Sequence, residues 1–344
     1  MRSALLVLLL ALPAPAGAFT GNTGGSTAQF LRIGAGARAL GLGEAFGPVA
    51  EGPDSMYWNP AGLASQRRPE VSYSHVEMMQ FFHHDYLAYA HPVKLLRGGV
   101  GAAMTMYYED SLDLVSNANE VQGRFRPHAE SIALGYGRSF LVGEDVEAVD
   151  RSYFQDKWDK ARDLQPLDHR DELWTGKLDA GLSMKYLQQS LYDRSASAVA
   201  FDGGVLFQQK DVQRLTLSFG FKNVGTAMKF INDSENLPSE LDLGAALDLP
   251  LEHNRRALFA FETAFPYYGA PHAKLGAEYT AGFVGGSMAA FRLGYKTLSA
   301  PDLGVLSGLT CGVGLLHGGV RFDVGFQPMD ALGNVFRFSL GYRF

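Results

Sequence analysis

The amino-acid sequence predicts an all-β protein, namely a transmembrane antiparallel β-barrel of about fourteen strands. Three features predict this fold class: an export signal at the amino terminus, period-two alternation along most of the chain, and an aromatic terminal strand. Composition agrees, because charged residues make up 19% against a typical ~25%, while glycine (40 residues) and aromatic residues (12%) are abundant. No apolar run after the export signal approaches the length of a spanning helix, so strands are the expected membrane-crossing elements.

The export signal occupies residues 1–18, "MRSALLVLLLALPAPAGA". It has one positive charge at Arg2, then an apolar run, then the small residues Ala16-Gly17-Ala18, which fit a cleavage site. We expect cleavage after Ala18 and export to the bacterial outer membrane. Cys311 is the single cysteine, so no disulfide within the chain is available, and a core or a closed sheet must hold the fold.

The alternation is clearest in "LTLSFGFKN" (215–223) and "LDLGAALDL" (241–249), where large apolar residues occupy every second position. A soluble sandwich also alternates, but its polar face is usually rich in Lys and Glu. Here the other face carries many glycines with mixed charges, which favours a barrel with large residues facing lipid and small ones lining the lumen. The predicted strands are 69–78, 84–93, 98–109, 129–140, 177–189, 196–209, 213–224, 239–250, 256–264, 271–281, 287–297, 304–316, 318–327 and 334–344.

The terminal segment "NVFRFSLGYRF" places apolar residues at every second position up to the last residue. This pattern resembles the signal by which the barrel-assembly machinery recognises bacterial outer-membrane barrels. We therefore expect Phe338, Leu340, Tyr342 and Phe344 to face outer-membrane lipid and to act as the barrel-insertion signal. The even strand number places both chain ends on the periplasmic side.

The segments "GAGARALGLGEAF" (34–46) and "YWNPAGLA" (57–64), followed by about fourteen strands, resemble the FadL-like outer-membrane barrels, most closely their PorV/PorQ-type branch. The resemblance implies that residues 19–67 form a hatch inside a barrel of residues 68–344. It places Trp58, Asn59, Pro60 and Ala61 in the hatch as candidate ligand-binding residues. Asn as a helix N-cap and Pro at the first helical position also predict a short helical turn, so a turn-shaping role and a ligand contact both remain open.

Other motifs in the chain predict no nucleotide site, metal site or catalytic site. Gly34–Ala39 matches the dinucleotide fingerprint, but no hydrophobic strand precedes it and no crossover helix follows. His83 and His84, near His75 and Asp85, are adjacent on a strand and must point to opposite faces, which argues against a metal site. No catalytic triad or paired carboxylates have a recognisable sequence context, so we expect no enzyme, no cofactor, no metal and no nucleic-acid partner. Cys311 falls on the lipid-facing set.

Charged residues also fall on the lumen-facing set, six acidic against eight basic. This near balance favours internal ion pairs that brace barrel and hatch over a pore selective for one sign of ion. The predicted lumen charges are Asp179, Asp202, Asp242, Asp248, Glu278, Asp323, Lys185, Lys222, Lys274, Lys296, Arg292, Arg321, Arg337 and Arg343.

An insertion at 141–176 interrupts the barrel pattern and carries ten acidic and five basic residues. Strand counting places it on the periplasmic side. Its aromatic residues Tyr153, Phe154 and Trp158 are candidates for docking a periplasmic partner, and a solvated elaboration without a partner is the alternative.

The family resemblance implies two functions of different classes. In the first, the barrel is an interaction or shuttle component associated with type IX-like protein secretion, with secretion-system proteins as partners. In the second, it is a passive channel for long-chain fatty acids or other hydrophobic compounds, with a hydrophobic small-molecule ligand. Composition and spacing by themselves favour neither.

Overall fold

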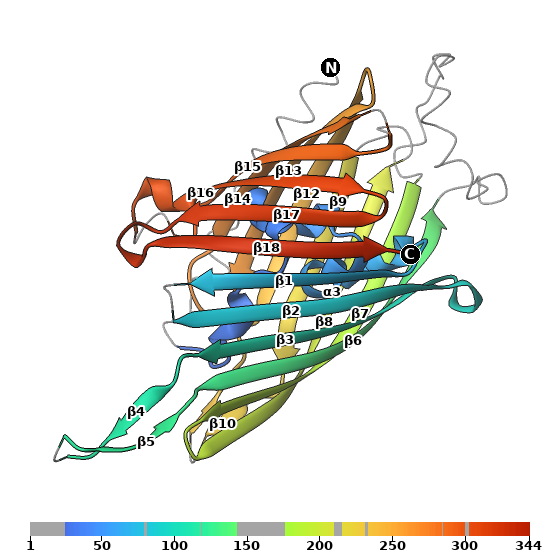
Figure 1. Cartoon of the computed structure of the whole chain (residues 1–344). Helices are drawn as coiled ribbons and strands as arrows, with labels where there is room; N and C mark the ends of the chain where they lie inside the picture. Colours follow the sequence, from blue (N-terminus) through green and yellow to red (C-terminus); the bar gives the residue numbers. More distant parts are fainter. Residues whose placement is uncertain are drawn as a thin grey trace.

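The computed structural model describes residues 25–78, 81–117, 119–142, 176–209, 215–230, 233–283, 285–299 and 303–344. Fourteen of the described strands form a closed, antiparallel barrel (Figure 1). The barrel strands are β1 (Glu70–Met78), β2 (Phe82–Val93), β3 (Gly98–Glu109), β6 (His128–Val142), β7 (Gly176–Leu191), β8 (Arg194–Gln209), β9 (Leu215–Gly225), β12 (Glu240–Leu251), β13 (Arg255–Pro266), β14 (His272–Gly282), β15 (Met288–Lys296), β16 (Leu309–His317), β17 (Val320–Pro328) and β18 (Asn334–Arg343).

The barrel closes where the first strand pairs with the last, from Glu70 opposite Arg343 to Glu77 opposite Phe336. All other neighbours follow chain order around the barrel. We call the end that holds Arg343 the carboxy-terminal end and the opposite end the hairpin end. Two short ribbons lie outside the barrel sheet, between strands that join at the hairpin end: β4 (Leu112–Val115) with β5 (Val121–Phe125), and β10 (Met228–Phe230) with β11 (Asp233–Glu235).

The predicted fold class and its fourteen strands are confirmed, with boundaries that mostly agree to within two residues. One predicted strand, 304–316, begins too early. Residues Val305–Gly308 form a 3-10 turn, η6, and the strand starts at Leu309. The turn begins at Gly304, whose φ of 83° lies outside strand geometry, and the Ser307 hydroxyl donates to the Gly304 carbonyl at 2.7 Å. The two short ribbons were not predicted.

The two faces of each strand differ as the alternation predicts. On β18 the side chains of Phe336, Phe338 and Leu340 are 44%, 42% and 52% exposed, while Arg337 and Ser339 are 3% and 5% exposed. Large apolar side chains therefore cover the outside of the barrel, and the lumen is polar and closely packed. Among the described residues, no helix has the length and apolarity needed to cross a membrane.

The hatch begins at Gly25 in the described chain and occupies the lumen, where Figure 1 shows its helical turns in blue behind β17 and β18. It starts at the hairpin end, where the Thr27 amide donates to the Asn236 carbonyl, and reaches the carboxy-terminal end at Ser65. Its elements are η1 (Gln29–Arg32), α2 (Ala37–Gly41), η2 (Gly47–Val49), η3 (Gly52–Asp54), α3 (Ser55–Trp58) and η4 (Pro60–Ser65). Two further 3-10 turns, η5 (Lys94–Leu96) and η7 (Asp330–Leu332), connect barrel strands.

Candidate functional site

A row of glycines in the wall receives the last turn of the hatch. Cross-strand register places five glycines directly opposite one another on β3, β6, β7, β8 and β9: Gly99, Gly137, Gly181, Gly204 and Gly220. A Cβ on Gly137 would lie 2.7 Å from the Ala64 amide nitrogen, and one on Gly181 would overlap Pro60. The missing side chains therefore let η4 lie directly on the sheet.

A second group of wall glycines receives α2 and the turn after it. Gly312 and Gly325 face Gly41 and Ala37, and Gly294 contacts the Gly43 backbone. Gly43 itself has a φ of 64° and lies against backbone atoms of Leu275 and Tyr295, so both its conformation and its surroundings require glycine. The glycines of residues 34–43 thus serve close packing inside the barrel.

The backbone amides that a nucleotide-binding loop would present to phosphate are occupied in this protein. The Gly36 amide donates to the Ser74 hydroxyl at 3.2 Å, and the Ala37 amide donates to the Ser339 hydroxyl at 2.7 Å. Both serines belong to the barrel wall. The resemblance to the dinucleotide fingerprint at Gly34–Ala39 therefore reflects attachment of the hatch to β1 and β18.

Asn59 is one of the hatch residues that contact the glycine row. It is the N-cap of η4, and its side-chain oxygen accepts from the Ala61 amide at 3.1 Å. Its amide nitrogen lies 3.5 Å from the Val205 carbonyl and 3.4 Å from the Phe219 carbonyl. In this closed arrangement the polar atoms of Asn59 are directed at protein partners, and Pro60 and Ala61 are buried with it against the wall.

Trp58 ends α3 and directly precedes Asn59. Its indole nitrogen donates to the Ala35 carbonyl at 2.8 Å, which ties two parts of the hatch together. The ammonium groups of Lys222 and Lys274 lie 5.4 and 5.8 Å from its ring, within cation–π range. Trp58 therefore links the hatch to a charged cluster on the wall.

That cluster consists of two lysines and three carboxylates on β9, β12, β13 and β14. Lys222 lies 2.9 Å from Asp242 and 3.0 Å from Glu240, and Lys274 lies 2.7 Å from Glu262. The carboxylate of Glu262 also accepts from the Gly47 amide at 2.7 Å. Buried charges of both signs compensate one another here and hold the middle of the hatch.

A second network centres on Arg38 in α2. Its guanidinium donates to both oxygens of Glu278, at 2.8 and 2.9 Å, and pairs with Glu51 within the hatch. Glu278 also accepts from Arg292, which reaches Asp323 at 2.8 Å. Burial opposes the charge of Arg38, but the carboxylates of Glu278 and Glu51 outweigh it and raise the pKa of the guanidinium.

Glu44 is the third charged anchor of the hatch. Its carboxylate lies 2.9 Å from Lys296 and 3.2 Å from Arg337. Burial by itself raises the pKa of Glu44, but the positive charges of Lys296 and Arg337 outweigh it and lower the pKa to about 2. The predicted internal ion pairs are confirmed, because every predicted lumen charge pairs with an opposite charge in the described chain.

The start of the hatch is held differently. Ala28, Phe30 and Leu31 are buried in an apolar seat at the hairpin end, formed largely by alanines of β6 and β8 together with Leu187, Met228 and Leu237. No ion pair is recorded for residues 25–33 in the part of the chain that the structure describes. Apolar burial and a few hydrogen bonds therefore fix this stretch, residues 25–33, which we call the outer end of the hatch.

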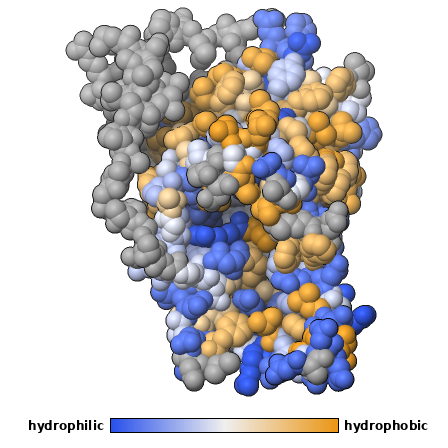
Figure 2. Space-filling model, turned by 90° about the vertical axis from the view of Figure 1, so that its left-hand side faces the viewer, coloured by the Kyte–Doolittle hydropathy of each residue, from blue (hydrophilic) through white to orange (hydrophobic). Residues whose placement is uncertain are grey.

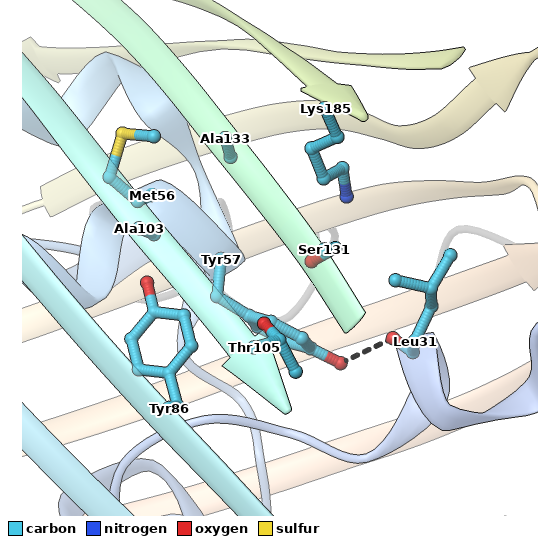
Figure 3. A pocket seen from close by; sticks show the side chains of 9 residues that line it. All are labelled: Leu31, Met56, Tyr57, Tyr86, Ala103, Thr105, Ser131, Ala133 and Lys185. Atoms are coloured by element: carbon cyan, nitrogen blue, oxygen red, sulfur yellow. Dashed lines mark hydrogen bonds between the residues drawn. The ribbon is translucent and has the colours of Figure 1, made fainter. Parts of the chain in front are cut away.

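A small cavity of about 20 Å³ lies beneath this outer end (Figure 3). Leu31, Met56 and Tyr57 of the hatch form one side, and β2, β3, β6 and β7 form the other. The Tyr57 hydroxyl donates to the Leu31 carbonyl at 2.8 Å, the bond drawn in Figure 3. Burial raises the pKa of Tyr57 well above its ordinary value, so this phenol stays protonated.

The remaining candidate residues lie apart from this cavity. His84 is fully buried, whereas His83 is partly exposed and stacks on Tyr108. His75 lies 2.8 Å from Asp85, and the described residues hold no cluster of metal-ligating side chains. Cys311 is exposed on the outer face. Tyr153, Phe154 and Trp158 of the insertion lie outside the described residues.

The sequence analysis missed several residues of the lumen. Glu240 and Glu262 belong to the lysine cluster, and Glu70 pairs with Arg343. Their positions were readable from the alternation, because Phe259 and Phe261 on the outer face put Glu262 on the inner one. The cavity had no sequence signal, since its lining comes from segments that only the closed barrel brings together.

Comparisons with known proteins support the fold. The model of an uncharacterised protein family (UPF0164) matches residues 11–132, which is less than half of the chain. No curated protein matches this sequence. Among solved structures, the TodX deltaS2S3 mutant monoaromatic hydrocarbon channel has a TM-score of 0.50 at 10% identity, covering 90% of this chain and 98% of that one.

Two more solved structures are similar over most of their length. The Pseudomonas putida toluene transporter TodX has a TM-score of 0.48 at 10% identity, with 90% of this chain and 98% of that chain covered. A Pseudomonas aeruginosa FadL homologue has a TM-score of 0.47 at 11% identity, with 94% and 99% covered. The likeness to the TodX deltaS2S3 mutant channel, at 10% identity, shows the barrel fold alone.

Proposed function

We propose that this protein is an outer-membrane channel for the passive uptake of hydrophobic compounds, closed at rest by its hatch. One observation carries the proposal: the outer end of the hatch sits in an apolar seat while its middle is fixed by buried ion pairs. An apolar molecule arriving at the hairpin end competes directly with Phe30 and Leu31 for that seat. Residues 28–31 are therefore the part of the hatch that such a molecule can displace without separating charges.

The direction of transport follows from the expected orientation. With both chain ends periplasmic, the hairpin end faces the outside of the cell, so the apolar seat is the first internal surface that an external compound meets. The fold likeness to a monoaromatic hydrocarbon channel agrees with this proposal. Passive uptake needs no cofactor, because the concentration gradient supplies the driving force.

Uptake by whole cells tests the proposal. Cells of a Gram-negative host that lacks its own channel for hydrophobic compounds would express either the full chain or an empty vector. We expect faster entry of labelled toluene with the full chain, at equal protein levels and with the barrel in the outer-membrane fraction. Equal entry rates, with a folded barrel present, would remove the proposed function.

Leu31→Asp sharpens this test, because a charge in the apolar seat should loosen the outer end of the hatch. The matched control is Leu332→Asp, since Leu332 is 41% exposed in η7 at the same end of the barrel. We expect the first variant to change the uptake rate and the second to leave it unchanged.

A second candidate is the interaction role in type IX-like protein secretion that the PorV/PorQ resemblance implies. The β4–β5 ribbon favours it, because this ribbon projects beyond the barrel and exposes Leu112, Val115 and Val121 at 44%, 47% and 61% (Figure 1). Figure 2, which faces the hairpin end, shows further hydrophobic side chains scattered among hydrophilic ones.

Crosslinking in cells separates this second candidate from uptake. A photocrosslinking residue at position 121 should capture a defined secreted protein, and Val115→Asp should reduce the yield. Normal secretion in cells that lack this protein would argue against the role.

A further inference from the structure

The cavity beneath Leu31 has one charged group in its lining, the ammonium of Lys185 on β7 (Figure 3). The rest of the lining is apolar or hydroxylic. The side chains of Thr105 and Ser131 line the cavity, and no hydrogen bond of either hydroxyl is recorded with the described residues. The chemistry available to a ligand is therefore set by these hydroxyls, the apolar surface and Lys185.

Lys185 is already neutralised by its neighbours. Its ammonium lies 2.7 Å from the Asp202 carboxylate and donates to the Asn223 side-chain oxygen at 2.6 Å. Asp202 is fully buried, and its other oxygen accepts from the backbone amide of Asn223 at 2.8 Å. The carboxylate sits at the register shift between β8 and β9, so it is built into the wall and is not free to leave Lys185.

The same compensation holds for other cations of the lumen. Arg38, Lys274 and Lys296 each lie within 2.9 Å of a carboxylate. A fatty-acid carboxylate entering this lumen would lose its hydration and find these three cations and Lys185 already paired. Burying such a charge without a counter-ion is strongly unfavourable. An uncharged apolar molecule meets no such penalty.

We infer that the cavity beneath Leu31 is a binding site for uncharged hydrophobic molecules with at most one hydrogen-bonding group, and that it rejects fatty-acid anions. This inference rests on the proposed uptake function and adds the ligand class. The closed cavity has room for about one water molecule, so a ligand requires Leu31 to withdraw. Withdrawal breaks the Tyr57–Leu31 hydrogen bond and turns the Tyr57 hydroxyl into a third group for a polar atom of the ligand.

Binding to the purified full chain tests the inference with pairs of probes that differ in charge. The pairs are toluene with benzoate and 1-decanol with decanoate. Trp fluorescence or equilibrium dialysis measures the binding of each probe. We expect the neutral member of each pair to bind at least about tenfold more tightly. Tighter binding of decanoate than of decanol would overturn the inference and leave the uptake function standing. Binding of neither pair would overturn both.

Asp202→Asn adds a gain-of-function test, because it leaves the Lys185 ammonium without its carboxylate. We expect decanoate binding to strengthen by about tenfold while toluene binding stays the same. The double variant Lys185→Met/Asp202→Asn removes both charges and should show no such gain. A gain in the double variant would contradict the assignment to Lys185. If Asp202→Asn alone fails to fold, the preference of the unaltered chain for neutral probes still decides the inference.

Discussion

Arg38 in the hatch and Glu278 on β14 lie 240 positions apart in sequence and share two parallel hydrogen bonds of 2.8 and 2.9 Å. Both side chains are almost fully buried, with exposures of 7% and 3%. The pair joins the hatch to the wall through a contact that water cannot replace while the barrel is closed. The hatch is therefore an electrostatically fixed part of the barrel interior.

Arg38→Met tests the strength of this attachment. It leaves Glu278 and Glu51 with less compensation, and breaking a buried pair from one side typically costs about 3–5 kcal/mol. We expect the hatch to be released at a lower urea concentration. Protease cleavage within residues 25–66 measures this release. Arg124→Met is the control, because the Arg124–Asp113 pair is exposed and should contribute under about 1 kcal/mol. Equal release in both variants would contradict an anchoring role for Arg38.

Gly181→Ala tests the glycine row. The added methyl overlaps Pro60, and such overpacking typically costs about 1–3 kcal/mol. We expect η4 to be displaced, with higher ion conductance of the barrel in a planar bilayer. Gly123→Ala on β5 meets nothing within 4 Å and should conduct like the unaltered chain. Unchanged conductance in Gly181→Ala would mean that the hatch is not seated on this row.

Asn59 variants separate a structural role from a ligand contact. Asn59→Asp keeps the cap on the Ala61 amide but directs a carboxylate at the Val205 and Phe219 carbonyls, whereas Asn59→Ala loses both contacts and about 1 kcal/mol of capping. A structural role predicts faster protease cleavage of the hatch in both, with the larger effect in Asn59→Asp. If instead ligand binding is lost with the hatch still protected, Asn59 contacts the ligand.

Glu44 makes the stability of the closed state depend on pH. Its pKa is about 2 in the closed barrel against 4.5 in its ordinary state, so its stabilising effect is fully present above pH 4.5 and is lost as pH falls toward 2. This shift contributes roughly 3 kcal/mol to the stability of the closed state. We expect conductance to rise over that interval, measured in planar bilayers. Glu44→Gln should conduct more at neutral pH and lack this part of the acid-induced rise; an identical acid profile would exclude Glu44 as its source.

The terminal aromatic residues are proposed to form the insertion signal. Phe344→Ala and Tyr342→Ala should lower the amount of folded barrel in the outer membrane several-fold, because the assembly machinery would bind the strand less well. Heat-modifiable mobility on gels measures the folded fraction. Phe283→Ala, equally exposed but far from the terminus, is the control and should assemble normally.

The strands were predictable because period-two alternation is a local property. Phe219 beside Gly220 and Phe338 beside Arg337 each assign a face without knowledge of the neighbouring strand. The cap of η4 was predictable for the same reason, since Asn59 and Pro60 act on adjacent backbone. The β4–β5 ribbon was missed because its strands are only four and five residues long, too short for a periodic signal.

The sequence by itself determined which residues face the lumen, and so it determined that charges and glycines would meet there. Only the tertiary structure decided which of them meet. Alternation sets the face of a strand but leaves its register free, and register depends on the stagger with which the whole barrel closes. That closure aligned Gly137 with Gly181, brought Glu278 to Arg38 and gave Lys185 its carboxylate, leaving a cavity without a free charge.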